Sequence, residues 1–273
     1  MLAAALRLRR WRERPEADEE GSAAPEQLQV AARLSDWLRG GPRWLRSEET
    51  DSLLQEYGIQ VLPTRRAAHP QGAASAASEL GFPVVLKGEG RAILHKSELG
   101  AVRLGLRSEV GVLDAAREMA SRLHGQGVEV ESFVVQPQLE GGVELLMGAV
   151  RDHQFGTVVA CGAGGTAVEL LHDTSVWLAP VSPTDAGEML AELGTYPLLT
   201  GFRGSPPVDV EAAIRTLAAL AALAEEHPAL AEVECNPVVV TEKGAFVVDS
   251  RARIEAPPPS LPVGAKRFAV ERG

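Results

Sequence analysis

The stretch FPVVLKGEGRAILHKSELGAVRLGL, residues 82–106, is the part of the sequence that decides the fold class. Its first six residues predict a buried strand, residues 101–106 predict a second strand, and Gly88 and Gly90 predict a turn between them. Along the rest of the chain helical and strand-like runs alternate, but several strands are also direct neighbours. This pattern favours a two-lobed α/β protein with α+β character over a purely doubly wound sheet.

Local signals predict the other helices and strands. Ser47 is followed by Glu48 and Glu49, which indicates an N-cap with an acidic first turn, and Ser108 is expected to cap a later helix. Helices are predicted at about 26–38, 47–57, 70–80, 108–124, 184–193 and 208–226, and strands at about 59–62, 82–87, 101–106, 128–136, 143–150, 156–161, 230–235 and 245–249.

Composition and charge limit the class of protein. The chain has 273 residues, of which 45% are hydrophobic, so it can bury a substantial core. Lys and Arg number 27 against 37 Asp and Glu, and this acidic balance argues against a nucleic-acid partner. Apolar runs such as 217–224 are too short to cross a membrane. Cys161 and Cys235 are too few for a disulfide scaffold or a cysteine zinc site, and they favour reduced thiols in a cytoplasmic protein.

Three features of the first two-thirds of the chain suggest phosphate chemistry. Lys87 ends an apolar strand beside glycines, an arrangement that suits a polyphosphate, although a lysine in solvent is the favoured reading of this residue alone. His95 is on a predicted loop and is a potential phosphoryl acceptor, or an ordinary surface histidine. Gly164 and Gly165 lie in the glycine-rich run 161–173, which suits either an anion-binding nest or a tight strand-to-helix turn.

Oxygen-bearing side chains end two apolar runs near the C-terminus. Glu234 and Asn236 lie in VECNP (233–237), and Asp249 lies in VVDS (247–250). Two adjacent strands would bring an amide and a carboxylate together, which suits Mg²⁺ shared with nucleotide phosphates. Taken alone, the pattern is better explained by an Asn-Pro turn and an exposed aspartate.

Each of these motifs is weak evidence alone, but their order along the chain is specific for one protein family. The sequence resembles the ATP-grasp subunit, or domain, of ADP-forming acyl-CoA synthetases, which are relatives of the succinyl-CoA synthetase β subunit. The resemblance covers about residues 46–256. It is carried by YGIQVLP, GFPVVLK, ILHKSELGAVRLGL, GGVELLMGAVRDHQFGTVV, GAGGTAVELLHD, YPLLTGFRG, ECNP and VVDSR.

The resemblance implies an ATP-grasp fold with ATP or ADP bound between two lobes. It implies a linker or arm at 1–45, an ATP-grasp domain at 46–256 with a smaller lobe at about 60–136, and a tail at 257–273. It also implies a partner subunit, a CoA-binding Rossmann protein that holds the acyl-CoA half of the reaction.

Roles for individual residues follow from the matching motifs. His95 matches the histidine that carries a phosphoryl group, and Glu234 an acid near it. Lys87 matches a phosphate-contacting lysine and Glu144 the acid that contacts ribose, whereas Asn236 and Asp249 match Mg²⁺ ligands. The hinge whose backbone contacts adenine runs from Gln136 to Leu139, and phosphate or structural roles are implied for Arg151, Gly164, Gly165 and Arg203.

One departure from the family pattern keeps a second function open. Trp177 stands where the family usually has an arginine, and Gly100-Ala101 stands where two glycines are common. The first hypothesis is the nucleotide half of an acid–thiol ligase, incomplete alone. The alternative is a non-catalytic nucleotide-sensing module, or a decayed fragment of a fused synthetase. A carboxylate–amine ligase is disfavoured, because such enzymes do not need the histidine motif.

Overall fold

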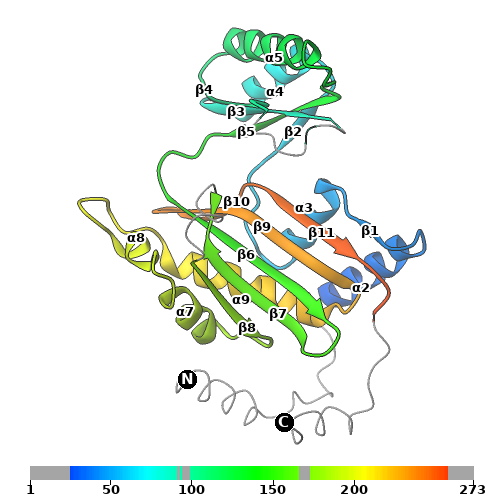
Figure 1. Cartoon of the computed structure of the whole chain (residues 1–273), viewed down its shortest axis with the longest axis vertical. Helices are drawn as coiled ribbons and strands as arrows, with labels where there is room; N and C mark the ends of the chain where they lie inside the picture. The colour runs from blue at the N-terminus through cyan, green and yellow to red at the C-terminus, as the bar shows by residue number, and fades with distance from the viewer. Residues whose placement is uncertain (1–24, 91–92, 94–98, 166–172, 258–273) are drawn as a thin grey trace, which may run out of the picture.

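The computed structural model describes residues 25–90, 93, 99–165 and 173–257, and these residues form two lobes with one β-sheet each (Figure 1). The small lobe is one contiguous part of the chain, between β2 and β5. The large lobe is built from the segments before and after it, so the chain crosses between the lobes twice (Figure 1).

The small lobe is a four-stranded antiparallel sheet with two helices on one face. Its strand order is β2 (Arg65–Ala67), β5 (Ser132–Pro137), β3 (Val84–Glu89) and β4 (Val102–Leu106), and its helices are α4 (Pro70–Leu80) and α5 (Glu109–His124). Val84 and Leu86 of β3 are buried in the core beneath these helices. Because strand side chains alternate, Val85, Lys87 and Glu89 lie on the opposite face of the sheet, which faces the large lobe.

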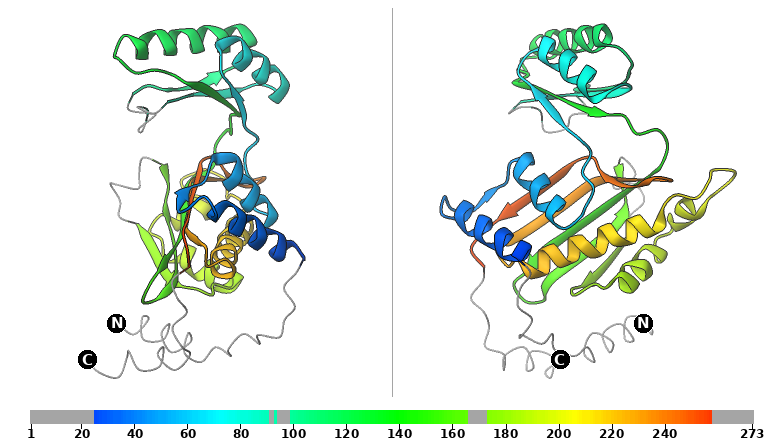
Figure 2. Two further views of the ribbon diagram at one scale, coloured as in Figure 1. Left: turned by 90° about the vertical axis from the view of Figure 1, so that its right-hand side faces the viewer. Right: turned by 180° about the vertical axis from the view of Figure 1, so that it is seen from behind.

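The large lobe has a seven-stranded antiparallel sheet. Its strand order is β1 (Arg43–Trp44), β11 (Ser250–Ile254), β9 (Leu230–Thr241), β6 (Val143–Asp152), β7 (Gly156–Ala163) and β8 (Thr174–Leu178), and β10 (Gly244–Val247) pairs with β9. The helices are α2 (Pro25–Leu38), α3 (Ser47–Glu56), α7 (Pro183–Ala191), α8 (Tyr196–Thr200) and α9 (Val210–Glu226). Figure 2 shows the long α9 running across the back of the sheet, where it buries Leu217, Leu220 and Leu223.

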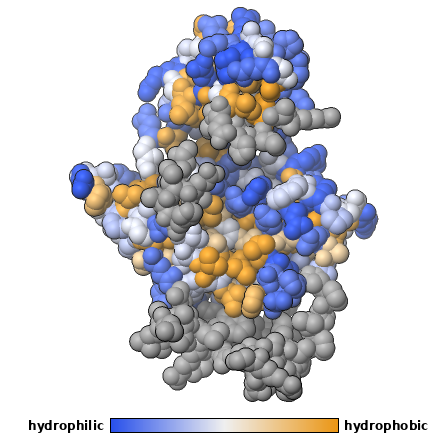
Figure 3. All heavy atoms as spheres, viewed as in Figure 1, coloured by the Kyte–Doolittle hydropathy of each residue, from blue (hydrophilic) through white to orange (hydrophobic). Residues whose placement is uncertain are grey.

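The other face of the large sheet carries apolar side chains that remain exposed. Val150 of β6 and Val176 of β8 point away from the helices, and Figure 3 shows apolar residues gathered over these strands. No helix among the described residues combines the length and the apolar character needed to span a bilayer.

The six predicted helices are confirmed, whereas the short α8 was not predicted, and the capping of α5 is confirmed in detail. Ser108 Oγ accepts a hydrogen bond from the amide of Gly111 at 3.1 Å. The predicted N-cap at Ser47 is wrong by one residue. Arg46 occupies that position, and its amide donates to the Glu49 carboxylate at 2.9 Å.

Three local predictions differ from the structure. The strand expected at 128–136 begins only at Ser132. Residues 59–62 form no strand, because the segment makes a single bridge from Val61 to Val247. Gly88 was expected in a turn but lies inside β3, opposite Phe133. A Cβ on Gly88 would come within 3.0 Å of Met119 Sδ, so this glycine permits close packing of α5 on the sheet.

The sequence analysis did not predict the short strands or the packing of α2 on the large lobe. β1, β2, β8 and β11 were not predicted, and they have two to five residues each. Within the expected arm at 1–45, α2 packs on the large lobe and buries Val30 and Leu34. The division of the chain at residues 45 and 256 stays a prediction.

Candidate functional site

Lys87 lies between the two lobes, in a small cavity that we call the inner cavity. The lysine projects from the face of β3 opposite the small-lobe core, and Asp249 approaches from the junction between β10 and β11. The cavity has a volume of about 30 Å³, enough for only a few waters. Its lining residues are Ser47, Asp51, Val61, Thr64, Arg66, Lys87, Glu89, Val134, Gln136, Val247, Val248, Asp249 and Ser250.

Charges of both signs meet in the inner cavity. The cations are Arg66 and Lys87, and the carboxylates are Asp51, Glu89 and Asp249. Burial raises the pKa of Asp51, and the nearby charge of Asp249 raises it further, against a 3.0 Å hydrogen bond donated by the Ser250 hydroxyl. The cavity is therefore a polar, partly desolvated site with an excess of negative charge.

Gln136 links the small lobe to the large one. Its Nε2 atom donates to the backbone oxygen of Val248 at 3.0 Å and to Thr64 Oγ1 at 2.9 Å. Its Oε1 atom is buried and has no hydrogen-bond partner among the described residues. The start of the predicted hinge is thus held against the large lobe while one acceptor remains available to a donor.

A larger cavity adjoins the predicted hinge, and we call it the outer cavity. Its volume is about 1040 Å³. It contains three of the predicted nucleotide-contacting residues: Leu139, Glu144 and Gly164. The complete lining is Pro83, Gln138, Leu139, Glu140, Gly141, Gly142, Val143, Glu144, Ala163, Gly164, Thr195, Leu198, Phe202, Ser205, Pro206, Val208, Thr241, Glu242, Lys243 and Phe246. This mixture of apolar rings and polar groups, at this size, suits a nucleoside.

Gly164 and Gly165 allow β7 to run close against β6. The amide of Gly164 donates to the backbone oxygen of Glu144 at 2.9 Å, and a Cβ on Gly164 would come within 2.5 Å of the Leu145 carbonyl carbon. Gly165 has a φ of +63°, and a Cβ there would overlap the Glu144 carboxylate. The glycines therefore make room for Glu144 beside the backbone.

Asn236 and Asp249 are neighbours in the structure. The amide of Asn236 donates to the backbone oxygen of Asp249 at 3.0 Å, and Asn236 Oδ1 accepts from the amide of Gly165 at 3.3 Å. An amide oxygen and a carboxylate are hard donors of the kind that Mg²⁺ uses together with phosphate oxygens. Within the described residues, no group of three or more His, Cys, Asp or Glu side chains has the arrangement needed to hold a metal ion.

Glu234 and Arg203 lie outside the lining given for either cavity. Glu234 is on β9 and accepts from Arg251 at 2.7 Å across the neighbouring strand. Arg203 is exposed, has a φ of 49° and lies over the ring of Phe202 at 5.3 Å. His95 lies outside the described residues, so its predicted role is not addressed by the structure.

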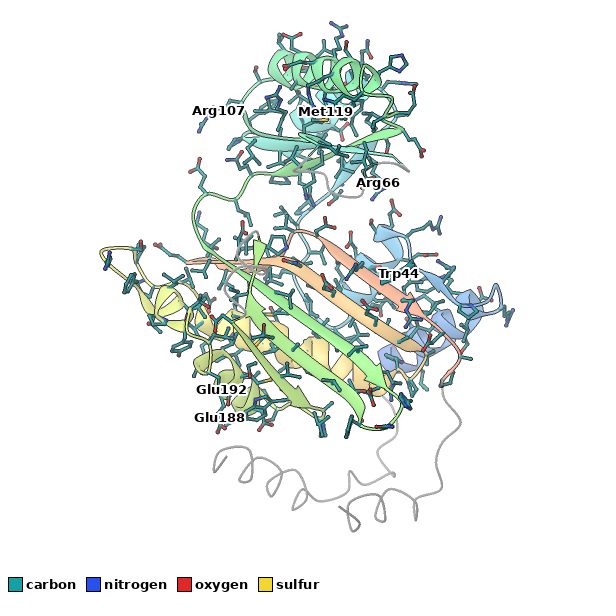
Figure 4. All side chains as sticks on the ribbon, in the orientation of Figure 1. Trp44, Arg66, Arg107, Met119, Glu188 and Glu192 are labelled. Atoms are coloured by element: carbon teal, nitrogen blue, oxygen red, sulfur yellow. The ribbon has the colours of Figure 1, made fainter. Side chains whose placement is uncertain are left out.

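Two residues with doubtful roles have clear structural contacts. Arg151 donates to the backbone oxygen of Ala224 at 2.9 Å, which satisfies a carbonyl at the C-terminal end of α9. Trp177 Nε1 donates to Glu192 at 3.1 Å and lines neither cavity. Figure 4 shows Glu192 beside α7, well away from the small lobe.

Several lining residues had no recognisable signal in the sequence. Asp51 has only the signal of an acidic residue near the start of a helix. Arg66 belongs to a strand of three residues, which is too short to show a period, and Thr64 precedes that strand. Lys87 and Asp249, which motifs suggested, are brought to the same cavity.

Comparison with known proteins agrees with this geometry. Residues 36–254 match the model of the ATP-grasp domain family. The chain is 34% identical over 228 residues to the β subunit of an ADP-forming acetate–CoA ligase I from Pyrococcus furiosus. That alignment covers 83% of this chain and 98% of the relative.

Longer relatives contain the same region as one part. The ADP-forming acetate–CoA ligase I of Archaeoglobus fulgidus is 38% identical over 201 residues, which cover 73% of this chain but only 29% of that protein. A solved acetyl-coenzyme A synthetase 1 from Ca. Korarchaeum cryptofilum matches with a TM-score of 0.70 and 38% identity. That match covers 83% of this chain and 100% of the solved chain. The solved complex contains coenzyme A and Mg-AMPPCP, with its phosphohistidine segment pointing towards the nucleotide-binding site.

The two-lobed antiparallel architecture, the cavities at the hinge and the match over most of the chain lead to one assignment. This chain belongs to the ATP-grasp domain family and is homologous to the β subunits of ADP-forming acetate–CoA ligases.

Proposed function

We propose that this chain is the nucleotide-binding half of an ADP-forming acyl-CoA synthetase, an acid–thiol ligase that transfers a phosphoryl group between ATP and His95. The observation that carries the proposal is the convergence of Lys87 and Asp249, from different lobes, on a cavity beside the larger one at the hinge. Family membership and the histidine motif at 95–100 support it.

Different parts of the nucleotide are proposed to bind in the two cavities. The base and ribose occupy the outer cavity, with the 136–139 backbone against adenine and Glu144 against the ribose hydroxyls. The phosphate chain extends towards Lys87, whose charge on a strand orients and neutralises phosphate oxygens. Gly164 and Gly165 keep side-chain atoms out of the space beside Glu144. Arg203 lies over the ring of Phe202, which lines the outer cavity. The proposed role of Arg203 is to contact the nucleotide from the large lobe.

Asn236 and Asp249 are the proposed protein ligands of Mg²⁺. Their donor atoms fit this hard cation, and the shared strand junction fixes their separation. Held by these two residues, Mg²⁺ would supply positive charge that offsets the charge of the nucleotide phosphates. Asp249 and Lys87 line the same cavity, so the carboxylate is placed on the side from which the phosphates would approach the lysine.

The proposed half-reaction is a single phosphoryl exchange. A neutral ring nitrogen of His95 attacks the γ-phosphorus, a P–N bond forms, and the bond from that phosphorus to the β–γ bridging oxygen breaks to leave ADP. Glu234 is proposed as the acid that supports the histidine. In the reverse direction the phosphohistidine returns its phosphoryl group to ADP.

A second subunit is needed for the complete reaction. The relative from Pyrococcus furiosus is named as a β subunit, which supports a partner for this chain. We propose that the partner is a CoA-binding Rossmann protein that exchanges acyl-CoA and phosphate for free acid, CoA and the phosphoryl group carried by His95.

The test is label transfer from ATP. The purified chain is incubated with Mg²⁺ and γ-labelled ATP beside two variants, His95→Ala and His153→Ala, the latter in the exposed turn between β6 and β7. We expect acid-labile, alkali-stable label on the wild type and on His153→Ala, and none on His95→Ala. Bound ATP without label on any of the three proteins would contradict the catalytic proposal and favour a nucleotide-sensing module.

A further inference from the structure

Arg66 connects the two lobes at the edge of the inner cavity. In the small lobe its Nη1 atom lies 2.7 Å from Glu89 Oε2. In the large lobe its Nη2 atom donates to Ser47 Oγ at 2.9 Å, and its Nε atom lies 3.0 Å from Glu48 Oε1. Figure 4 shows Arg66 on the side of the small lobe that faces the large lobe. One guanidinium therefore holds β2 and β3 against the start of α3, and we call these contacts the Arg66 bridge.

The inner cavity is too small for what it is proposed to hold. Its volume of about 30 Å³ admits only a few waters, whereas the outer cavity has a volume of about 1040 Å³, which admits a nucleoside. The two linings are close along the chain, since Val247 lines the inner cavity and Phe246 the outer one. Phosphate groups that extend from the outer cavity towards Lys87 must displace atoms that line the inner cavity. Ser47, Arg66 and Glu89, three members of the bridge, are among those lining residues.

The Arg66 bridge is the contact best able to give way. The side chain of Glu48 is 63% exposed and that of Arg66 is 36% exposed, so both charges are partly solvated and their separation costs little. A guanidinium also binds phosphate oxygens through paired N–H donors at least as well as it binds a carboxylate. Phosphate in the cavity would therefore compete directly with Glu48 and Glu89 for Arg66.

We propose that Arg66 is a second phosphate-binding residue that is held by Glu48, Ser47 and Glu89 while the cavity is empty. On nucleotide entry Arg66 exchanges its carboxylate partners for phosphate oxygens, and the link between β2 and α3 is released. This inference rests on the proposed nucleotide-binding function. It assigns to Arg66 a contact with the phosphate chain of the nucleotide and none with the base.

The first test compares ATP with adenosine, because adenosine fills the outer cavity only. We expect Arg66→Ala to weaken ATP binding about tenfold, the scale of a charge-assisted hydrogen bond, and to leave adenosine binding within about twofold. Glu48→Gln frees Arg66 and should tighten ATP binding about two- to fivefold, the scale of an exposed ion pair. Binding is measured by calorimetry with Mg²⁺ present throughout.

Arg65→Ala is the matched control. Arg65 precedes Arg66 on the same strand and is 54% exposed, but its nearest acid is Glu79 of the same lobe at 3.9 Å. It is absent from the inner-cavity lining that the described residues provide. This variant loses the same charge from the same strand, so its ATP affinity should stay within about twofold of the wild type.

The second test measures the lobes without any ligand. Dyes are attached to Arg117→Cys on α5 and Arg215→Cys on α9, two exposed positions, and energy transfer reports the distance between the lobes. Cys161 and Cys235 are buried, and burial raises the pKa of both thiols, so the dyes react at the introduced cysteines. We expect Glu48→Gln and Arg66→Ala to widen the distance distribution, and ATP to shift the wild type in the same direction.

The outcomes separate this inference from the proposed function. If the wild type binds ATP and Arg66→Ala binds ATP equally well, only the Arg66 proposal is overturned. Equal losses for ATP and adenosine in Arg66→Ala would also overturn it, because they would indicate a general structural defect. If the wild type binds no ATP, both proposals fail.

Discussion

Asn236 and Asp249 lie side by side because β9 changes its pairing partner at this point. Before Asn236 the strand pairs with β11, as Cys235 does with Ser250, and after Pro237 it pairs with β10. The connection between β10 and β11 therefore passes Asn236, whose amide donates to the backbone oxygen of Asp249 at 3.0 Å. The exchange of pairing partners along β9 is what brings the backbones of Asn236 and Asp249 side by side.

The first prediction concerns the dependence of nucleotide binding on Mg²⁺. In the wild type we expect Mg²⁺ to tighten ATP binding. In Asp249→Asn and Asn236→Ala we expect that gain to fall about tenfold or more, because the first variant loses the negative charge of a ligand and the second loses an oxygen ligand altogether. Calorimetry with and without Mg²⁺ measures the gain.

Asp152→Asn is the control for the Mg²⁺ prediction. Asp152 accepts hydrogen bonds from the amides of Gln154 and Phe155 in the turn after β6. This variant should keep the wild-type response to Mg²⁺. If Mg²⁺ tightened ATP binding to Asp249→Asn as much as to the wild type, Asp249 would not be a Mg²⁺ ligand.

The second prediction concerns the close approach of Gly164 to β6. Gly164→Ala places a Cβ within 2.5 Å of the Leu145 carbonyl carbon, so the two strands must separate. We expect a loss of about 2 kcal/mol in the free energy of unfolding, measured by urea denaturation.

Gly125→Ala provides the comparison for Gly164→Ala. Gly125 has a φ of −62°, and the nearest atom to its added Cβ would be 3.4 Å away. Its stability should stay within about 0.5 kcal/mol of the wild type. If both variants lose the same stability, the close approach at Gly164 is not the cause.

The third prediction concerns stability at low pH. Paired hydrogen bonds from Arg43, with further contributions from Arg46, lower the pKa of Glu49 from 4.5 to about 2. A lowered folded-state pKa stabilises the protein above pH 4.5, and this contribution disappears as the pH falls from 4.5 towards 2. Glu49→Gln should therefore cost about 2 kcal/mol at pH 7, and much less near pH 2.

The pH prediction is checked by urea denaturation across pH 2 to 7. Glu79→Gln is the control, because the side chain of Glu79 is largely exposed and its nearest cation, on Arg65, is 3.9 Å away. This variant should follow the wild-type curve. A Glu49→Gln curve parallel to the wild type would show that the pair with Arg43 does not stabilise the fold.

The fourth prediction concerns the departure at Trp177. Its indole donates to Glu192 on the part of the large lobe away from the small lobe. We expect Trp177→Arg to change ATP affinity by less than about twofold, since an arginine there would still meet Glu192. A large gain in affinity would instead show that this position reaches the nucleotide and that the tryptophan weakens binding.

The sequence by itself determined the features that depend on neighbours along the chain. The apolar run at 82–87 predicted the strand that became β3, and Ser108 was recognised as a cap because its bond to Gly111 spans three residues. Motif order identified the family, and it named Lys87, Glu144 and Asp249 before their cavities were known. The role of His95 stays a prediction from its motif.

Only the tertiary structure decided which distant segments meet. Nothing local indicates that Arg66 contacts Glu48, that Gln136 donates to Val248, or that β9 exchanges β11 for β10 at Asn236. Caps and periodicity reflect free energies set within a few residues. Contacts between the lobes depend instead on the packing of two separate cores and on strand register, which no short window of sequence contains.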